Sequence, residues 1–144
     1  MVERKIRTTG CFMEYDGKFV VLHRHPDRPD GDTWGLPAGK VNADETDEQT
    51  ILREIKEETG YNAAKEELEF LGDYVFEFPD LYLEFPTYRL KLKQPVDVEH
   101  KPDEHVGYKW VTGEECYAMP NLIRGFHDLL ERTDYVKTSY TLKK

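Results

Sequence analysis

The chain has 144 residues, with 29 acidic against 20 basic side chains and a formal net charge of −9. This length predicts a single domain over residues 1–144, with a core over about residues 5–132 and a polar tail over 133–144. The acidic balance and the lack of a basic run argue against a dedicated nucleic-acid surface. A nucleotide substrate stays compatible with this charge, because metal ions can offset both sets of negative charge.

Membrane and redox features are also limited by the composition. No apolar run is long enough to span a bilayer, and the first residues lack the apolar core of a signal peptide, so no membrane association is expected. The two cysteines, Cys11 and Cys116, are far apart and match no metal or redox spacing. We expect reduced, partly buried thiols, consistent with a cytoplasmic location.

The first third of the chain is predicted to be extended. Residues 5–15 and 18–24 read as two strands joined by an Asp-Gly pair, which is a strong hairpin signal. Residues 25–32 are rich in Pro, Asp and Gly and predict a loop. Residues 34–38 predict a short strand or an extended turn.

A helix is predicted over about residues 46–59. Asp44 or Thr46 can cap its start, and Thr46 with Gln49 has the form of a capping box. Gly60 is placed to end the helix in the left-handed conformation. Aliphatic residues at helical spacing form an apolar face directly beside a row of acids.

The second half of the chain predicts further strands and a second helix. Residues 68–78 and 82–93 carry the aromatic and β-branched alternation of strands. Residues 94–107 are polar and indicate a mobile loop, which a short strand over 108–111 follows. Apolar residues at helical spacing predict a helix over 121–132. Mixed strands with two helices indicate an α/β or α+β layered fold.

Three glutamates of the first predicted helix, Glu54, Glu57 and Glu58, stand at positions i, i+3 and i+4. They occupy an arc of roughly 100° on the helix surface. Like charges at these spacings cost about 0.2–0.5 kcal/mol per pair, and the last turns of a helix favour cations instead. The arrangement makes sense if a divalent cation completes the site, since Mg²⁺ takes hard carboxylate oxygens and shares them with substrate phosphates. Arg53, one turn before Glu57, is placed to pair with it.

This stretch resembles the Nudix hydrolase family, whose signature is G-x5-E-x7-R-E-U-x-E-E-x-G-U with U a bulky aliphatic residue. The positions that match in register are Gly39, Glu45, Arg53, Glu54, Ile55, Glu57, Glu58 and Gly60. Tyr61 stands where an aliphatic residue is usual, a departure that affects packing and leaves the acids untouched.

The resemblance implies an α/β/α sandwich with a mixed β-sheet and the matched motif on a loop-helix-loop. It also implies Mg²⁺ (or Mn²⁺) dependent hydrolysis of the diphosphate linkage of a nucleoside diphosphate joined to a further group X. Divalent ions suit this reaction because they neutralise the charged oxygens and lower the pKa of a bound water.

Residue roles follow from the same resemblance. Glu57 and Glu58 align with the principal metal ligands, and the backbone carbonyl of Ala38 aligns with a further ligand of some members. Glu54 matches a position that acts as a base or as a metal ligand in different members. Arg53 orients a neighbouring glutamate. The residues that support the motif are Gly39, Glu45 and Gly60.

A fifth acid is expected outside the motif, on a loop before a late strand. Glu104 is the best candidate, because it lies six residues before Trp110, a spacing seen in relatives. Asp97, Glu99 and Asp103 are nearby rivals, and a solvated loop acid is the alternative for all four.

The substrate is less explicit in the sequence. Trp34 closely precedes the motif and could line the pocket or serve as a packing anchor, and Arg24 lies at a strand end where it could contact the substrate. The aromatic residues that could stack on a base are Phe12, Tyr15, Tyr74, Phe76, Phe78, Tyr82, Phe85 and Tyr88. We expect a nucleoside triphosphate or a nucleotide sugar as the substrate. The alternatives are a dinucleoside polyphosphate or capped RNA, or a binding module without catalysis, and a homodimer is left open.

Overall fold

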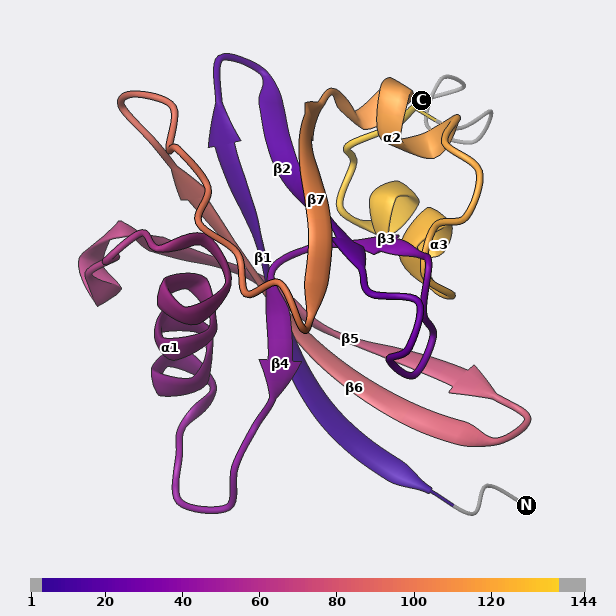
Figure 1. Ribbon diagram of the computed structural model, residues 1–144. Coiled ribbons are helices and arrows are strands. Elements are labelled where there is room, and N and C mark those ends of the chain that lie inside the picture. The colour runs from indigo at the N-terminus through magenta and orange to yellow at the C-terminus, as the bar shows by residue number, and fades with distance from the viewer. Residues whose placement is uncertain (1–3, 138–144) are drawn as a thin grey trace.

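The computed structural model of the protein describes residues 4–137 (Figure 1). It begins with a hairpin of β1 (Lys5–Tyr15) and β2 (Lys18–Arg24). The two turn residues, Asp16 and Gly17, both have positive φ, at 53° and 79°. Two-residue hairpin loops need this conformation because it matches the twist of the strands, so the predicted hairpin is confirmed.

Among residues 4–137, seven strands form one mixed sheet. The remaining strands are β3 (Trp34–Gly35), β4 (Ala38–Lys40), β5 (Leu68–Phe78), β6 (Leu81–Lys91) and β7 (His105–Val111). The strand order is β3-β2-β1-β6-β5, with β4 paired to β1 and β7 paired to β2. β1 and β6 run parallel, and the other pairs are antiparallel.

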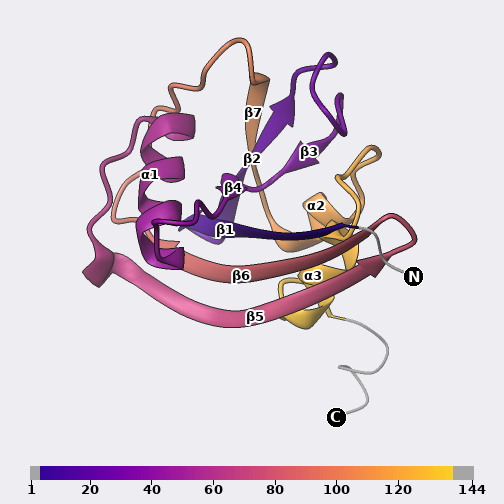
Figure 2. The ribbon, with the colours of Figure 1, turned by 90° about the horizontal axis from the view of Figure 1, so that it is seen from below.

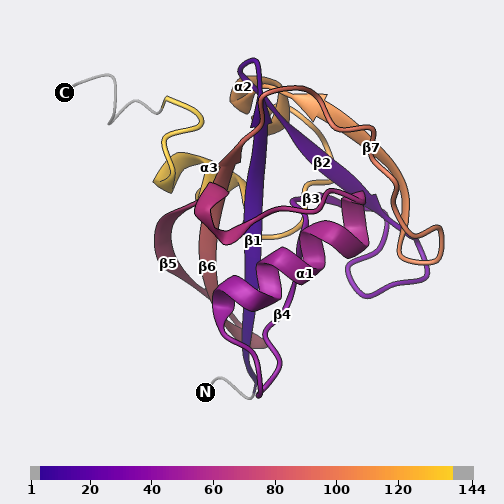
Figure 3. The same cartoon turned by 90° about the vertical axis from the view of Figure 1, so that its left-hand side faces the viewer.

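Helices cover both faces of this sheet. α1 (Asp47–Thr59) lies on one side, and α2 (Gly113–Tyr117) and α3 (Phe126–Arg132) lie on the other (Figures 2 and 3). Successive residues of a strand point to opposite faces. Val20 therefore packs in the cluster that contains Ile51 of α1, whereas Val21 packs in the cluster that contains Leu130 of α3. The expected α/β/α sandwich is confirmed.

α1 carries the local signals that the sequence predicts. Thr46 is its N-cap, and the Thr46 and Gln49 side chains each bond the other residue's backbone N–H in a reciprocal capping box. Gly60 ends the helix with φ 82°, a conformation that side chains rarely adopt. These caps fix where the helix starts and stops, and therefore which way its acids face.

The later elements differ from the prediction in their bounds. α3 begins only at Phe126, because Asn121 and Gly125 have left-handed backbones, with φ 61° and 89°, that no continuous helix accommodates. β7 begins at His105, three residues earlier than expected. The alternation of buried and exposed side chains does not mark this start, because both Val106 and Tyr108 are exposed.

Two short elements complete the fold. α2 is not predicted from the sequence, although Thr112 and Glu115 form its capping box. A short 3₁₀ helix, η1 (Lys65–Glu67), precedes β5. The polar segment before β7 packs beside α1, since Val98 is buried and the Glu99 N–H bonds the Thr59 carbonyl at 2.9 Å. The mobility of this segment stays a prediction.

The packed region extends past residue 132. The Tyr135 ring stacks on Phe12 at 3.9 Å between centroids, so the start of the expected polar tail is part of the core. Residues 138–144 of that tail lie outside the described residues. Cys11 and Cys116 are buried free thiols. None of the helices within residues 4–137 has the length and apolarity of a membrane span.

Candidate active site

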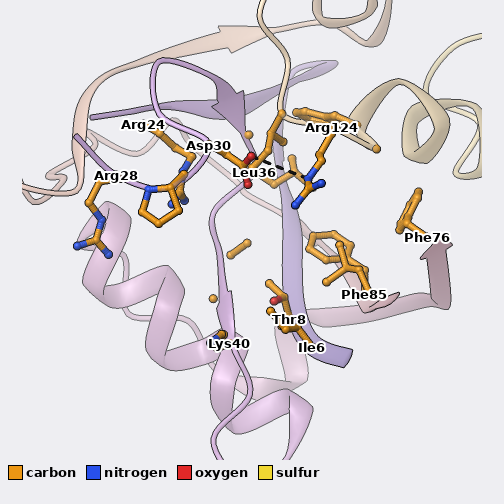
Figure 4. Close-up of a pocket in the computed structure, with 18 of the residues that line it drawn as sticks. Ile6, Thr8, Arg24, Arg28, Asp30, Leu36, Lys40, Phe76, Phe85 and Arg124 are labelled. Atoms are coloured by element: carbon orange, nitrogen blue, oxygen red, sulfur yellow. Dashed lines mark hydrogen bonds and ion pairs between the residues drawn. The ribbon is translucent and has the colours of Figure 1, made fainter. Parts of the chain in front are cut away.

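A cavity of about 660 Å³ lies over β1, β5 and β6 (Figure 4). α1 and β4 line one side of it, and residues 123–129, which include the start of α3, line another. The loop between β2 and β3 and the residues at the start of β7 complete the lining. This volume lies within the range of pockets that hold small molecules.

Four acids line the cavity: Glu54 and Glu58 come from α1, Glu104 from the turn before β7, and Asp30 from the β2–β3 loop. Glu58 is buried, and its Oε1 accepts a hydrogen bond from the Ala38 N–H at 2.8 Å. Glu54 lies against Gly39, where an added Cβ would overlap its carboxylate. The glycine of the motif therefore lets β4 approach the helix closely enough to place both acids in the cavity.

Arg53 binds three of the motif glutamates at once. It forms a two-pronged contact with Glu45, at 2.8 Å from Nε and 2.9 Å from Nη2. Its Nη1 also donates to Glu54 at 2.7 Å and to Glu57 at 3.2 Å. The pairing with Glu57 is the one that the sequence spacing predicts. The two-pronged pairing with Glu45 is not predicted by helix periodicity, because Glu45 lies before the start of the helix. The guanidinium lowers the pKa of Glu45 to about 2.

Two acids of the cavity, Glu54 and Glu58, have raised pKa values. Burial raises the pKa of Glu58 well above its usual range, and the charges of Glu54 and Glu104 raise it further, against the Ala38 N–H and Arg24. Burial also raises the pKa of Glu54, with Glu57 and Glu104 adding to the effect and Arg53 opposing it. The wall therefore carries more negative charge than its neighbours offset, which is the electrostatic setting that a divalent cation stabilises.

The donor set fits Mg²⁺ or Mn²⁺, which bind hard carboxylate oxygens. Within residues 4–137, no three acid, histidine or cysteine side chains are gathered closely enough to hold a metal by themselves. Mg²⁺ commonly binds through one or two carboxylates together with substrate phosphates and water. Glu54 and Glu58 are the carboxylates on α1 that could supply this share. Glu57 is more exposed and does not line the cavity, and its role as a ligand stays a prediction.

The backbone of Ala38 meets the site through its N–H, which donates to Glu58. A role for its carbonyl as a metal ligand stays a prediction. Gly60 lies at the end of α1, where a Cβ would contact the Glu99 side chain.

Glu104 is held in the cavity by its backbone. Its N–H bonds the Lys101 carbonyl at 3.0 Å, and its carbonyl accepts from the His25 N–H at 2.9 Å. Its carboxylate lies 3.8 Å from the Arg28 guanidinium. The rivals differ in position: Asp97 and Glu99 line a second cavity beside the end of α1, and Asp103 lines neither.

The two expected substrate contacts separate in the structure. Arg24 lines the cavity, and its Nε donates to the Pro29 carbonyl at 3.0 Å. Trp34 does not line it; its ring stacks on His23 at 4.5 Å, and the Lys109 ammonium lies 5.0 Å from its centroid. A substrate contact at Trp34 stays a prediction.

The end of the cavity away from α1 is apolar and aromatic. Of the eight aromatic candidates, three line it, namely Phe76, Phe78 and Phe85. The Phe85 ring lies over Gly10, where an added Cβ would overlap it. At the rim, the Arg124 guanidinium carbon lies 4.8 Å from the centroid of the Phe78 ring, a contact that is not predicted from the sequence.

Arg124 connects two loops at this rim. Its two terminal nitrogens bind Asp80 in the β5–β6 turn at 2.8 and 3.2 Å. Its Nε lies 3.9 Å from Asp30 in the β2–β3 loop (Figure 4). No periodic pattern in the sequence marks Arg124, because it acts across segments that are far apart along the chain.

Comparisons with known proteins find relatives in sequence and in fold. The model of the NUDIX domain matches residues 4–131. The chain is 28% identical over 116 residues to the protein named Phosphatase NudJ of Escherichia coli (strain K12), covering 80% of this chain and 73% of that protein.

Solved structures show the same fold. The MutT protein from Methanosarcina mazei Go1 superposes with a TM-score of 0.78 at 28% identity, covering 93% of this chain and 96% of that one. The MutT NUDIX hydrolase from Burkholderia pseudomallei superposes with a TM-score of 0.74 at 22% identity, covering 94% of this chain and 100% of that one.

Proposed function

The chain belongs to the NUDIX domain family of MutT-like hydrolases, and we propose that it cleaves the diphosphate linkage of a nucleoside triphosphate or a nucleotide sugar with the help of Mg²⁺ or Mn²⁺. The observation that carries this proposal is the cavity in which Glu54, Glu58 and Glu104 meet opposite an aromatic end. One end is acidic and can hold a metal ion with the phosphates of a nucleotide, and the other is aromatic and can hold its base.

The acidic end suits the phosphates. A divalent ion bound there would neutralise the diphosphate oxygens and lower the pKa of the attacking water. Arg24 acts on Glu58 and Arg28 lies 3.8 Å from Glu104, so both lie beside the acids, and Lys40 also lines the cavity (Figure 4). All three can pair with phosphate oxygens. Arg28, which lies near Glu104, is placed to leave that carboxylate for a phosphate.

The remaining roles follow from the contacts. Arg53 holds Glu54 in one orientation, which a ligand or a base requires. Glu104 is the candidate general base, because it is a carboxylate in the cavity whose position the backbone fixes. Glu54 is the other candidate for this proton transfer.

The aromatic end suits the base of the nucleotide. A planar ring can stack on Phe85 or Phe76 without leaving hydroxyl groups unpaired, whereas a sugar in that place would lose hydrogen bonds to water. Arg124 at this rim already has two carboxylates as partners, which offset its charge, whereas Arg4 also lines the cavity. The phosphates are expected at the other end, where Glu54 and Glu58 can hold a divalent ion.

The test is a substrate panel. The protein is incubated with Mg²⁺ and separate nucleoside triphosphates, deoxynucleoside triphosphates, nucleotide sugars, dinucleoside polyphosphates and capped RNA, and the products are identified by mass. We expect a nucleoside monophosphate from a triphosphate or a nucleotide sugar. Preferred cleavage of a dinucleotide or of capped RNA contradicts the proposed substrate. No cleavage of any compound contradicts the proposed activity and favours a binding module.

The relative named as a phosphatase sets a further expectation for the panel. Products should be examined for inorganic phosphate as well as pyrophosphate, since either release breaks a phosphate anhydride. A homodimer and a cytoplasmic location stay predictions.

A further inference from the structure

His105 is a buried histidine that the proposed chemistry does not yet use. It is the first residue of β7, directly follows Glu104, and lines the same cavity. Its side chain is part of a residue only 4% exposed, and its Nδ1 has no hydrogen-bond partner among residues 4–137. Buried polar atoms are nearly always paired, so an unpaired ring nitrogen beside a cavity calls for a partner that the protein alone does not supply.

The position of His105 is fixed by the sheet. It pairs with Arg24 of β2, at the point where the register of the two strands shifts. Both residues therefore face the acidic part of the cavity from adjoining strands. Burial lowers the pKa of His105 to about 4, and the nearby charges of Arg24, His100 and Arg28 act in the same direction. The ring is accordingly neutral near pH 7 and carries one N–H donor.

We propose that His105 contacts the substrate, donating a hydrogen bond from its ring to a non-bridging phosphate oxygen at the acidic end of the cavity. This inference rests on the proposed function. Phosphate oxygens are acceptors, which suits whichever ring nitrogen carries the proton, and the neighbours Arg24 and Arg28 favour an anion at the same place. A neutral donor can bind a phosphate without forming an ion pair with Glu104.

His100 provides a matched control. It belongs to the same segment of chain, and its Nδ1 is also buried without a partner. It does not line the cavity, and its ring lies edge-on to Tyr108 at 6.4 Å. If the unpaired nitrogens reflect only the packing of this segment, the two histidines will respond alike to a ligand. If His105 contacts phosphate, only His105 will respond.

The direct experiment is nitrogen-15 NMR of the imidazole rings in the intact protein, with resonances assigned by the His100→Asn and His105→Asn variants. The probes are inorganic pyrophosphate and a methylene-bridged nucleoside diphosphate, each with Mg²⁺. We expect the ring nitrogen resonances of His105 to shift on binding and those of His100 to stay in place. Binding without a shift at His105 overturns this inference alone. No binding of either probe contradicts the proposed function as well.

Kinetics give an independent measure. Removing a contact made equally to the substrate and to the transition state raises KM and leaves kcat unchanged. We expect His105→Leu to raise KM about tenfold or more, His105→Asn, which keeps an N–H donor, to recover part of this loss, and His100→Leu to leave KM unchanged. A fall in kcat without a change in KM, or equal effects at both histidines, overturns the inference. If His105→Leu does not fold, the NMR titration of the unmodified protein decides.

Discussion

Replacing Arg53 with methionine removes the cation that holds Glu45, Glu54 and Glu57 in place. The side chain keeps its length and apolar stem but loses four charged hydrogen bonds. Two of these form the fork onto Glu45, which joins α1 to the segment before it. We therefore expect a loss of stability together with a loss of activity.

The magnitude follows from the contacts and their exposure. Arg53 is about a third exposed, at 32%, so each contact is assigned roughly 0.5–1 kcal/mol, the upper part of the range for exposed ion pairs. Four contacts give about 2–4 kcal/mol, which corresponds to a fall in Tm of roughly 5–15 °C for a domain of this size. Because Glu54 loses its orientation, we also expect kcat to fall at least tenfold.

The pH dependence of this effect has a definite sign. Arg53 lowers the pKa of Glu45 to about 2 in the folded protein, below its ordinary value of 4.5. A depressed carboxyl pKa contributes stability above the ordinary value, and this stability is lost as the pH falls toward the folded value. The Tm difference between the unmodified protein and Arg53→Met is therefore expected to be full at pH 7 and to narrow between about pH 4.5 and pH 2.

The assay is thermal unfolding in a metal chelator across this pH range, with kcat measured at pH 7 in Mg²⁺. Arg89→Met is the control, since Arg89 forms a two-pronged contact of the same kind with Glu69, outside the cavity. Equal Tm values at pH 7 for Arg53→Met and the unmodified protein, or an unchanged kcat, would contradict the holding role of Arg53.

Two further substitutions test the geometry of the cavity. In Gly39→Ala the new Cβ overlaps the Glu54 carboxylate, so kcat should fall at least tenfold. Gly107→Ala is the control and should keep the original kcat, because a Cβ at Gly107 meets nothing within 4 Å. Equal kcat values for the two variants would contradict this packing. Phe85→Ala should weaken binding of a nucleotide by about 1–3 kcal/mol, seen as a raised KM, but leave the KM of inorganic pyrophosphate unchanged. Phe70→Ala, on an exposed ring of the same sheet, is its control, and a similar rise in KM there would argue against a base at Phe85.

The sequence predicts the elements whose signals are local. α1 is found nearly to the residue, because Thr46, Gln49 and Gly60 each act within a few positions of the helix end. The β1–β2 hairpin is found for the same reason, since its turn conformation belongs to two adjacent residues. The three glutamates on one face of the helix follow from helical periodicity, and the family resemblance adds the reaction class to them.

Features set by backbone conformation or by distant segments are harder to predict. Apolar spacing placed the start of the second long helix at residue 121, but the left-handed Gly125 delays it to Phe126. Glu104 was singled out by its spacing from Trp110, and its place in the cavity depends on backbone bonds to Lys101 and His25. The spacing between Glu104 and Trp110 predicts neither of these hydrogen bonds.

The aromatic end and its rim lie beyond what the sequence pattern shows. Phe85 could not be separated from the other aromatic residues, because only the packing over Gly10 places its ring in the cavity. Arg124 joins Asp30 and Asp80, which are far from it along the chain. His105 gave no signal, since its distinguishing property is an unpaired atom in a folded environment.

We propose that the buried carboxylate of Glu58 serves metal-dependent hydrolysis at the expense of stability. The most direct measurement compares Glu58→Gln with the unmodified protein, in turnover of the best panel substrate with Mg²⁺ and in Tm with a chelator. The substitution keeps the shape of the side chain and removes a carboxyl group whose pKa is raised by burial. We predict turnover at least a hundredfold lower with an equal or higher Tm, and no such change for Glu99→Gln outside the cavity. Unchanged turnover in Glu58→Gln would contradict the account.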